Sequence, residues 1–116
     1  MKNLYNVEDF TYDEFILFNA LSKDKTLPSS KTTLNSLTGF NTRKIKELVK
    51  QLRRKGVPVC AQITNGGGYW IEEDKKEFGR FVAQQKTQLE GYKKSYQDMR
   101  NIYNSLDGED ENGWFE

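Results

Sequence analysis

Basic side chains are concentrated between residues 43 and 55, where seven of the thirteen residues are lysine or arginine and Glu47 is the single acid. The segment 31–60 carries a net charge of +7, although the whole chain of 116 residues carries only +1. Ammonium and guanidinium groups in such a cluster can neutralise phosphates, and arginine can also bridge two acceptors on a guanine edge. This charge segregation indicates a nucleic-acid partner.

Other kinds of chemistry find little support in the composition. The chain has no histidine and a single cysteine, Cys60, so the commonest general base, the usual zinc ligand sets and a Cys–His pair are all missing. A lone cysteine also cannot form an intramolecular disulfide, and we interpret Cys60 as a small structural residue. The sequence therefore predicts a protein that is not an enzyme, with no metal and no cofactor.

The basic residues have the spacing of one face of a helix over residues 42–55. Ile45, Leu48, Val49 and Leu52 repeat at helical spacing and form the inward face, Thr42 can cap the helix and Gly56 can end it. The side chains expected on the outward face are Asn41, Thr42, Arg43, Lys44, Lys46, Glu47 and Lys50.

A shorter helix over residues 31–37 precedes it, with Leu34 and Leu37 turned inward. Counted from residue 31, Gly39 takes the ninth place of a twenty-residue helix-turn-helix, where the backbone angle φ is positive. The inward positions four, ten, fifteen and eighteen then hold Leu34, Phe40, Ile45 and Leu48. Position five, usually a small residue, holds Asn35, and position eight holds Thr38.

Two further elements complete the expected domain. Thr11 and Glu14 form a capping-box signature for a helix over residues 11–22, and Ser29 or Ser30 can cap the next helix after a loop with Pro28. Residues 57–63 alternate in polarity, residues 65–68 turn the chain, and residues 69–71 return it as a short hairpin. Phe15, Phe18 and Phe40 are interpreted as core residues.

These elements predict a mainly α (α+β) fold, a three-helix winged helix-turn-helix with a two-stranded wing, followed by a long C-terminal helix. The segment GFNTRKIKELVKQLRRKGVPV at residues 39–59, with GGYWI at residues 67–71, resembles the amino-terminal DNA-binding domain of biotin-operon repressors. The resemblance covers about 45 residues, and nothing resembles the biotin ligase domain of those proteins, so it implies no enzyme activity. Small regulators and replication proteins of phages and plasmids are the closer overall comparison.

The helix-turn-helix assigns each outward residue an expected role on double-stranded DNA. Arg43 and Lys46 are best placed for base edges, with Glu47 as an acceptor for a cytosine amine. Residues expected on phosphates, or solvated, are Lys44, Lys50, Arg53, Arg54 and Lys55, while Asn41 and Thr42 are candidates for phosphate or base contacts. At the wing tip, Asn65, Gly66 and Gly67 either approach an adjacent groove or only form a tight turn.

After residue 72 the sequence has no helix breaker until residue 107. Alternating steps of four and three along this segment form a seam that predicts a coiled coil. Its members are Phe78, Val82, Gln85, Leu89, Tyr92, Tyr96, Met99, Tyr103 and Leu106. All except Gln85 are expected to mediate a homodimer. The flanking residues do not specify a parallel pair through salt bridges, and an antiparallel dimer, a higher oligomer or packing onto the winged domain stay open.

The chain thus divides into a winged helix-turn-helix domain (1–72), a long helix (73–106) and an acidic tail (107–116) with net charge −5. The tail is expected to solvate the protein, with docking to a protein partner or screening of the basic helix as alternatives. No signal peptide or membrane segment is visible, which favours a cytoplasmic protein.

Taken together, the sequence predicts a sequence-specific double-stranded DNA-binding protein that acts as a dimer and regulates transcription or a replication origin. The alternative is a protein-interaction module, such as a mobile-element inhibitor that binds a host protein through the winged fold, the aromatic helix or the tail. The near-neutral total charge, the tyrosines of the seam and the acidic tail favour that alternative.

Overall fold

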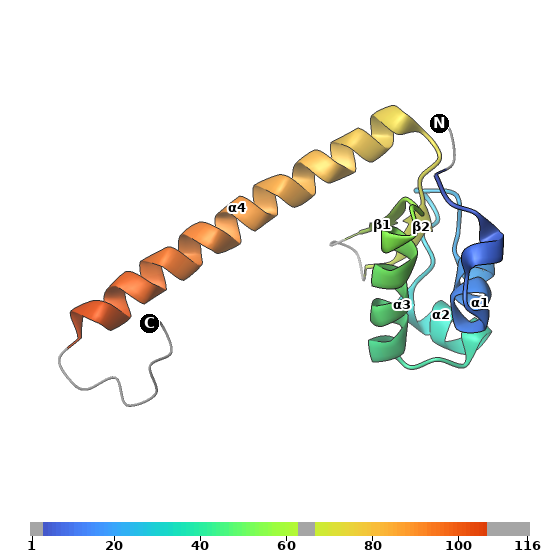
Figure 1. Cartoon of the computed structure of the whole chain (residues 1–116), viewed down its shortest axis with the longest axis horizontal. Coiled ribbons are helices and arrows are strands. Elements are labelled where there is room, and N and C mark those ends of the chain that lie inside the picture. The colour runs from blue at the N-terminus through green and yellow to red at the C-terminus, as the bar shows by residue number, and fades with distance from the viewer. Residues whose placement is uncertain (1–3, 63–66, 107–116) are drawn as a thin grey trace. The chain divides into compact units, whose positions relative to one another are not determined.

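The structure, a computed structural model, describes residues 4–62 and 67–106. It is mainly helical, with one two-stranded antiparallel sheet, and falls into two compact units, Met1–Gly79 and Arg80–Glu116 (Figure 1). The elements are a 3-10 turn η1 (Val7–Asp9), helices α1 (Tyr12–Ala20), α2 (Lys31–Thr38) and α3 (Thr42–Arg54), strands β1 (Val59–Ala61) and β2 (Tyr69–Ile71), and helix α4 (Lys75–Ser105).

Helix α1 begins with the predicted capping box. The Thr11 hydroxyl accepts a hydrogen bond from the Glu14 N–H (3.3 Å), and the Glu14 carboxylate accepts one from the Thr11 N–H (2.8 Å). These bonds satisfy two of the backbone donors that a helix start leaves unpaired. The helix ends at Ala20, two residues before the predicted end.

The loop between α1 and α2 is joined to the hairpin. Ser30 caps α2 by accepting from the Thr33 N–H (3.1 Å), as the sequence predicted. Ser29 has another function, because its backbone exchanges two hydrogen bonds with Tyr69 of β2 (2.8 and 2.9 Å). A side chain on Gly68 would place its Cβ 3.1 Å from Pro28 and Ser29, so this close approach requires glycine.

The turn between α2 and α3 has the predicted glycine in the left-handed region, with Gly39 at φ 76°. The cap of α3 differs from the prediction. Asn41, not Thr42, is the N-cap residue, because its extended backbone lets its side-chain oxygen accept from the Lys44 N–H at 2.8 Å. Thr42 is already the first helical residue.

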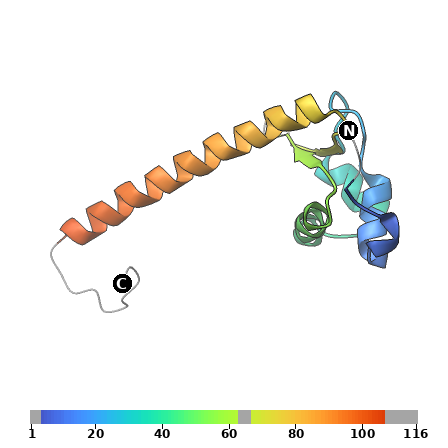
Figure 2. The ribbon, with the colours of Figure 1, turned by 45° about the horizontal axis from the view of Figure 1, so that its top comes forward.

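The core of the first unit lies between α1, α2, α3 and the sheet. It contains Leu17, Leu21, Leu34, Ile45, Leu48, Val49, Leu52, Val57, Val59 and Ile71. Helices α1, α2 and α3 all contact one another, and α3 also contacts β1. Figure 2 views α3 close to end-on, with the β1 arrow next to it.

Two predicted core residues are exposed. Leu37 is 64% exposed, because α2 packs into the core through Leu34, its single buried residue. Phe15 is 41% exposed, whereas Phe18 packs with Tyr5 and Phe10 at ring-centroid distances of 5.6 and 5.2 Å. The aromatic cluster therefore draws its other members from the segment before α1.

The hairpin pairs Val59 with Ile71, Cys60 with Trp70 and Ala61 with Tyr69. Cys60 is fully buried, as expected for a small structural residue, and burial raises the pKa of its thiol to about 12. Of the predicted wing, residues 63–66 lie outside the described residues.

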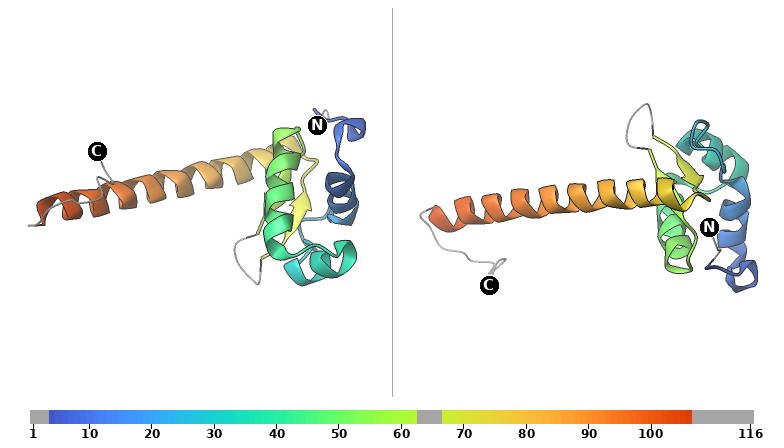
Figure 3. Two further views of the ribbon diagram at one scale, coloured as in Figure 1. Left: turned by 60° about the horizontal axis from the view of Figure 1, so that its bottom comes forward. Right: turned by 90° about the horizontal axis from the view of Figure 1, so that it is seen from above.

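Helix α4 begins at Lys75, later than the predicted residue 73, because Asp74 caps it by accepting from the backbone N–H groups of Lys76 (2.8 Å) and Glu77 (3.2 Å). It continues without interruption through Gly79 and Gly91 to Ser105 (Figure 3). None of the described helices is long and apolar enough to cross a membrane.

Candidate nucleic-acid interface

Helix α3 separates apolar and basic residues between its two faces. Ile45, Leu48, Val49 and Leu52 are at most 5% exposed and pack into the core, as predicted. The opposite face is exposed, and it carries the lysines and arginines that the sequence assigned to nucleic acid. The buried face therefore fixes which side chains point to solvent.

Arg43 and Lys46 lie in the first half of this outward face, and both are exposed. Arg54, at the last turn, is exposed too. Across the part of the chain that the structure describes, these three side chains have no hydrogen-bond or ion-pair partner. A ligand can therefore engage them without first breaking a contact within the protein.

Lys44 is tied to the neighbouring elements instead. Its amine lies 2.8 Å from the Asp13 carboxylate of α1 and 4.2 Å from the centroid of the Phe40 ring. Both groups attract a cation, so an approaching phosphate has to compete with them. The sequence placed Lys44 on phosphate or in solvent, and it gave no signal for this pairing with Asp13.

Lys55 also interacts within the protein, whereas the sequence placed it on phosphate or in solvent. Its amine pairs with the Glu14 carboxylate and bonds the Asp9 carbonyl oxygen at 2.9 Å. Glu14 is only 2% exposed, so Lys55 compensates a buried charge. The capping-box signature revealed the backbone role of Glu14, but nothing local in the sequence pointed to a partner forty-one residues away.

The remaining basic residues of α3 differ in how they are held. The Arg53 Nε donates to the Val59 carbonyl oxygen (2.9 Å), which links the end of α3 to β1. Lys50 lies 4.0 Å from Glu47, one turn earlier, and both side chains are more than half exposed. An exposed pair of this length is weak, so Lys50 remains accessible to a phosphate.

Asn41 and Thr42 both use their side chains inside the turn. The Asn41 oxygen caps α3, and the Thr42 hydroxyl accepts from the Asn35 amide at 3.5 Å. The buried Asn35 carbonyl oxygen has no hydrogen-bond partner among the described residues. Asn35, an unusual residue for position five of the pattern, therefore bridges α2 and α3 by one long hydrogen bond.

The predicted wing contacts are described only in part. Gly67 has φ 77° and Gly68 has φ 133°, both in the region that favours glycine. The Gln62 N–H donates to the Gly68 carbonyl oxygen (2.9 Å), which continues the hairpin beyond β1. Asn65 and Gly66 lie outside the described residues, as does the acidic tail at 107–116.

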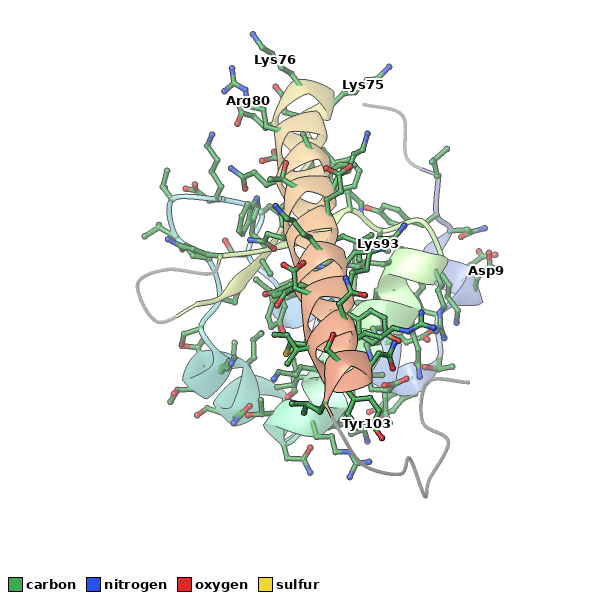
Figure 4. The ribbon with its side chains drawn as sticks, turned by 90° about the vertical axis from the view of Figure 1, so that its left-hand side faces the viewer. Asp9, Lys75, Lys76, Arg80, Lys93 and Tyr103 are labelled. Atoms are coloured by element: carbon green, nitrogen blue, oxygen red, sulfur yellow. The ribbon has the colours of Figure 1, made fainter. Side chains whose placement is uncertain are left out.

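The predicted dimerisation residues lie on α4, except Leu106, which directly follows its last residue. Six of them are 48% or more exposed, namely Val82, Leu89, Tyr92, Tyr96, Met99 and Leu106, while Phe78 and Tyr103 are half-buried. Basic side chains also project from this helix, with Lys75, Lys76 and Arg80 in its first turns and Lys93 farther along (Figure 4).

No group of three or more His, Cys, Asp or Glu side chains in the described residues is arranged to hold a metal ion. Comparison of the chain with protein-family models, with curated proteins and with solved structures gives no match. The geometry of α3 and α4 is therefore the basis for assigning a function.

Proposed function

We propose that the chain is a non-enzymatic, sequence-specific double-stranded DNA-binding protein whose first unit acts as a winged helix-turn-helix. Three features support this proposal. Gly39 makes the left-handed turn between α2 and α3, α3 buries one face and exposes basic residues on the other, and a short hairpin follows. In this arrangement α3 is the recognition helix.

The observation that carries the proposal is the pair of uncommitted cations in the first half of α3, Arg43 and Lys46. The N-terminal part of a recognition helix is the part that reaches base edges in the major groove. An arginine there can donate two hydrogen bonds to guanine O6 and N7. We assign Arg43 and Lys46 to base recognition, with Thr42 and Glu47 beside them.

Other residues contribute affinity more than sequence choice. Lys50 and Arg54 are exposed on the same helix and suit phosphate contacts, which are sequence-independent and sensitive to salt. Lys44 can join them only by giving up its pair with Asp13. Asn65, Gly66 and Gly67 of the wing stay candidates for backbone contacts with an adjacent phosphate.

The exposed seam of α4 supports dimerisation, because two-fold protein symmetry matches two DNA half-sites. A dimer that reads a defined operator would regulate transcription or a replication origin in the cytoplasm. The acidic residues 107–116 would solvate the protein or contact a protein partner.

Selection of random duplexes by the purified full-length protein tests this function. We expect repeated rounds at moderate salt to enrich one motif, and the Arg43→Ala variant to enrich it weakly or not at all. Lys23→Ala, in the loop before α2, is the matched loss of one exposed charge and should leave selection unchanged. Recovery of no sequence above bulk competitor DNA would reject specific DNA binding.

One observation favours a protein-interaction module as the second candidate. Tyr12, on α1, is 78% exposed and Leu37, on α2, is 64% exposed, in addition to the aromatic seam of α4. Apolar surface of this kind marks protein contacts when it is contiguous. Failure of the duplex selection, with the protein folded, would make this candidate the leading one.

A further inference from the structure

Helix α4 contains 31 residues, and none of them is buried within the described chain. Most of the stability of a protein helix comes from packing one apolar face. Six residues of the seam are 48% or more exposed, so this face requires a partner. We infer that this seam is covered by α4 of a second copy of the chain, and that the two helices run parallel and in register. The DNA consequence given below rests on the proposed function, whereas the pairing itself does not.

The seam consists of two rows. The first row is Val82, Leu89, Tyr96 and Tyr103, and the second row is Phe78, Gln85, Tyr92, Met99 and Leu106. Each row repeats every seven residues, and the two rows alternate by steps of four and three. This is the spacing with which two helices interlock their side chains over a long contact.

The residues that flank the seam differ in charge between its two sides. The basic flank, one residue after the second row, contains Lys86, Lys93 and Arg100. The uncharged flank, one residue before the first row, contains Phe81, Gln88, Ser95 and Ile102. Within α4 (Lys75–Ser105) neither flank contains an acid, so the orientation of the pair depends on where the three cations are placed.

The relative orientation of the two α4 helices determines which residues of the second copy lie opposite each cation. In an antiparallel pair like flanks face each other, so Lys86, Lys93 and Arg100 of one copy would lie opposite the same residues of the other. In a parallel pair each flank faces the opposite flank of its partner, at a spacing of five residues. Lys93 then meets Gln88 and Arg100 meets Ser95 of the second copy, which avoids the repulsion.

Gln85 supports the parallel register. It is the one polar side chain in the seam, and in a parallel pair it faces Gln85 of the second copy. Each amide can then donate to and accept from the other, because a glutamine side chain has both groups. A shift by one heptad would bury each amide against an apolar neighbour, so this layer favours the in-register pair.

A parallel pair brings the beginnings of the two α4 helices together. An antiparallel pair would separate them by about the length of the helix, roughly 46 Å for 31 residues at 1.5 Å rise. Half-sites read by a two-fold dimer lie about 34 Å apart on one face of the duplex. The parallel pair therefore presents both copies of the first unit from the same end of the coiled coil.

Cysteine cross-linking of the full-length protein tests the orientation. Met99→Cys places a thiol in the second row, where a parallel pair brings the two Cα atoms within about 6 Å, a separation that a disulfide spans. We expect mild oxidation to give a covalent dimer for Met99→Cys but not for Asn101→Cys on the outward side. The wild type is the control for Cys60, which is fully buried. A dimer in solution without a Met99→Cys cross-link would overturn the parallel arrangement.

A charge substitution gives an independent readout. Gln88→Glu with Ser95→Glu places acids opposite Lys93 and Arg100 in a parallel pair. We expect the dissociation constant of the dimer to fall several-fold. In an antiparallel pair the new acids would face each other, and the dissociation constant of the dimer would rise. Gln84→Glu with Asn101→Glu, outside the flanks, is the matched control.

Sedimentation of the wild-type protein separates the two proposals. A monomer at all concentrations would overturn the pairing of α4, yet the duplex selection could still succeed. Failure of that selection by a cross-linked dimer would reject the function and leave the pairing intact.

Discussion

The amine of Lys55, at the C-terminal end of α3, pairs with the carboxylate of Glu14, which is 2% exposed in the first turn of α1. The same carboxylate accepts from the Thr11 N–H and so completes the capping box of α1. One buried acid therefore holds the start of α1 and the end of the proposed recognition helix together. The orientation of α3 depends on this pair as well as on its apolar face.

Replacement of Lys55 by methionine tests the pair. We expect Lys55→Met to reduce the free energy of unfolding by about 2 kcal/mol, below the usual value for a broken buried pair because Lys55 is itself 32% exposed. Urea unfolding followed by circular dichroism measures the change. Glu14→Gln should cost about 1 kcal/mol, because glutamine retains the capping bond. Additive effects in the double variant would show that the two groups do not interact.

The pH dependence of stability gives a second test of Glu14. Burial alone would raise the pKa of this carboxyl, but hydrogen bonds from Lys55 and Thr11 more than offset burial, so the pKa lies below its usual 4.5. Because the pKa is lower in the folded state, ionised Glu14 stabilises the protein above about pH 4.5. That contribution is lost as the pH falls through the folded pKa.

The measurement is the difference in free energy of unfolding between wild type and Glu14→Gln from pH 3 to pH 7. We expect a constant difference above about pH 5.5 that becomes smaller below about pH 4.5, since glutamine does not titrate. A difference that grows on acidification would mean that the pKa of Glu14 is raised, contrary to the contacts in the structure.

Asn41 separates helix capping from DNA contact. We expect Asn41→Ala to lower the free energy of unfolding by about 1 kcal/mol through loss of the cap, and Asn41→Ser to leave it nearly unchanged because serine caps equally well. Thermal unfolding checks both variants. If Asn41→Ser keeps stability but weakens DNA binding, Asn41 contacts DNA as well. Equal destabilisation by alanine and serine would exclude the capping role.

Asn35 is a position where substitution should stabilise the protein. Asn35→Ala removes a buried carbonyl oxygen with no partner among the described residues, loses one long hydrogen bond and improves helix propensity. We expect a gain of about 0.5–1 kcal/mol in urea unfolding. Ser36→Ala, exposed on the same helix, reports the propensity gain alone. A loss of stability would show that the Asn35–Thr42 contact is stronger than its length suggests.

The sequence predicted features that depend on local chemistry. The capping box of α1, the Ser30 cap, the left-handed Gly39 and the buried face of α3 all follow from residue type and helical spacing. Predictions that depend on neighbours in space were wrong in part. Leu37 has the spacing of an inward residue, but it is 64% exposed because none of the described elements covers it.

The same distinction applies to the candidate interface. Helical spacing identified the outward face of α3, yet it could not show that Lys44 and Lys55 are paired with acids of α1. Those acids, Asp13 and Glu14, are distant in the sequence from the two lysines, and they come next to them only when α1 packs on α3. Among the described residues, Arg43, Lys46 and Arg54 are the basic side chains of this helix without a hydrogen-bond or ion-pair partner. Arg43 and Lys46 are the ones we propose as contacts to bases.

The most direct test of recognition by α3 is the affinity of wild type, Arg43→Ala and Lys50→Ala for the selected duplex and for a scrambled duplex, over a range of salt concentrations. We expect Arg43→Ala to lose about 1–3 kcal/mol on the selected duplex and little on the scrambled one. Lys50→Ala should weaken both equally and reduce the salt slope by about one. Equal losses on both duplexes for Arg43→Ala would contradict base recognition by this helix.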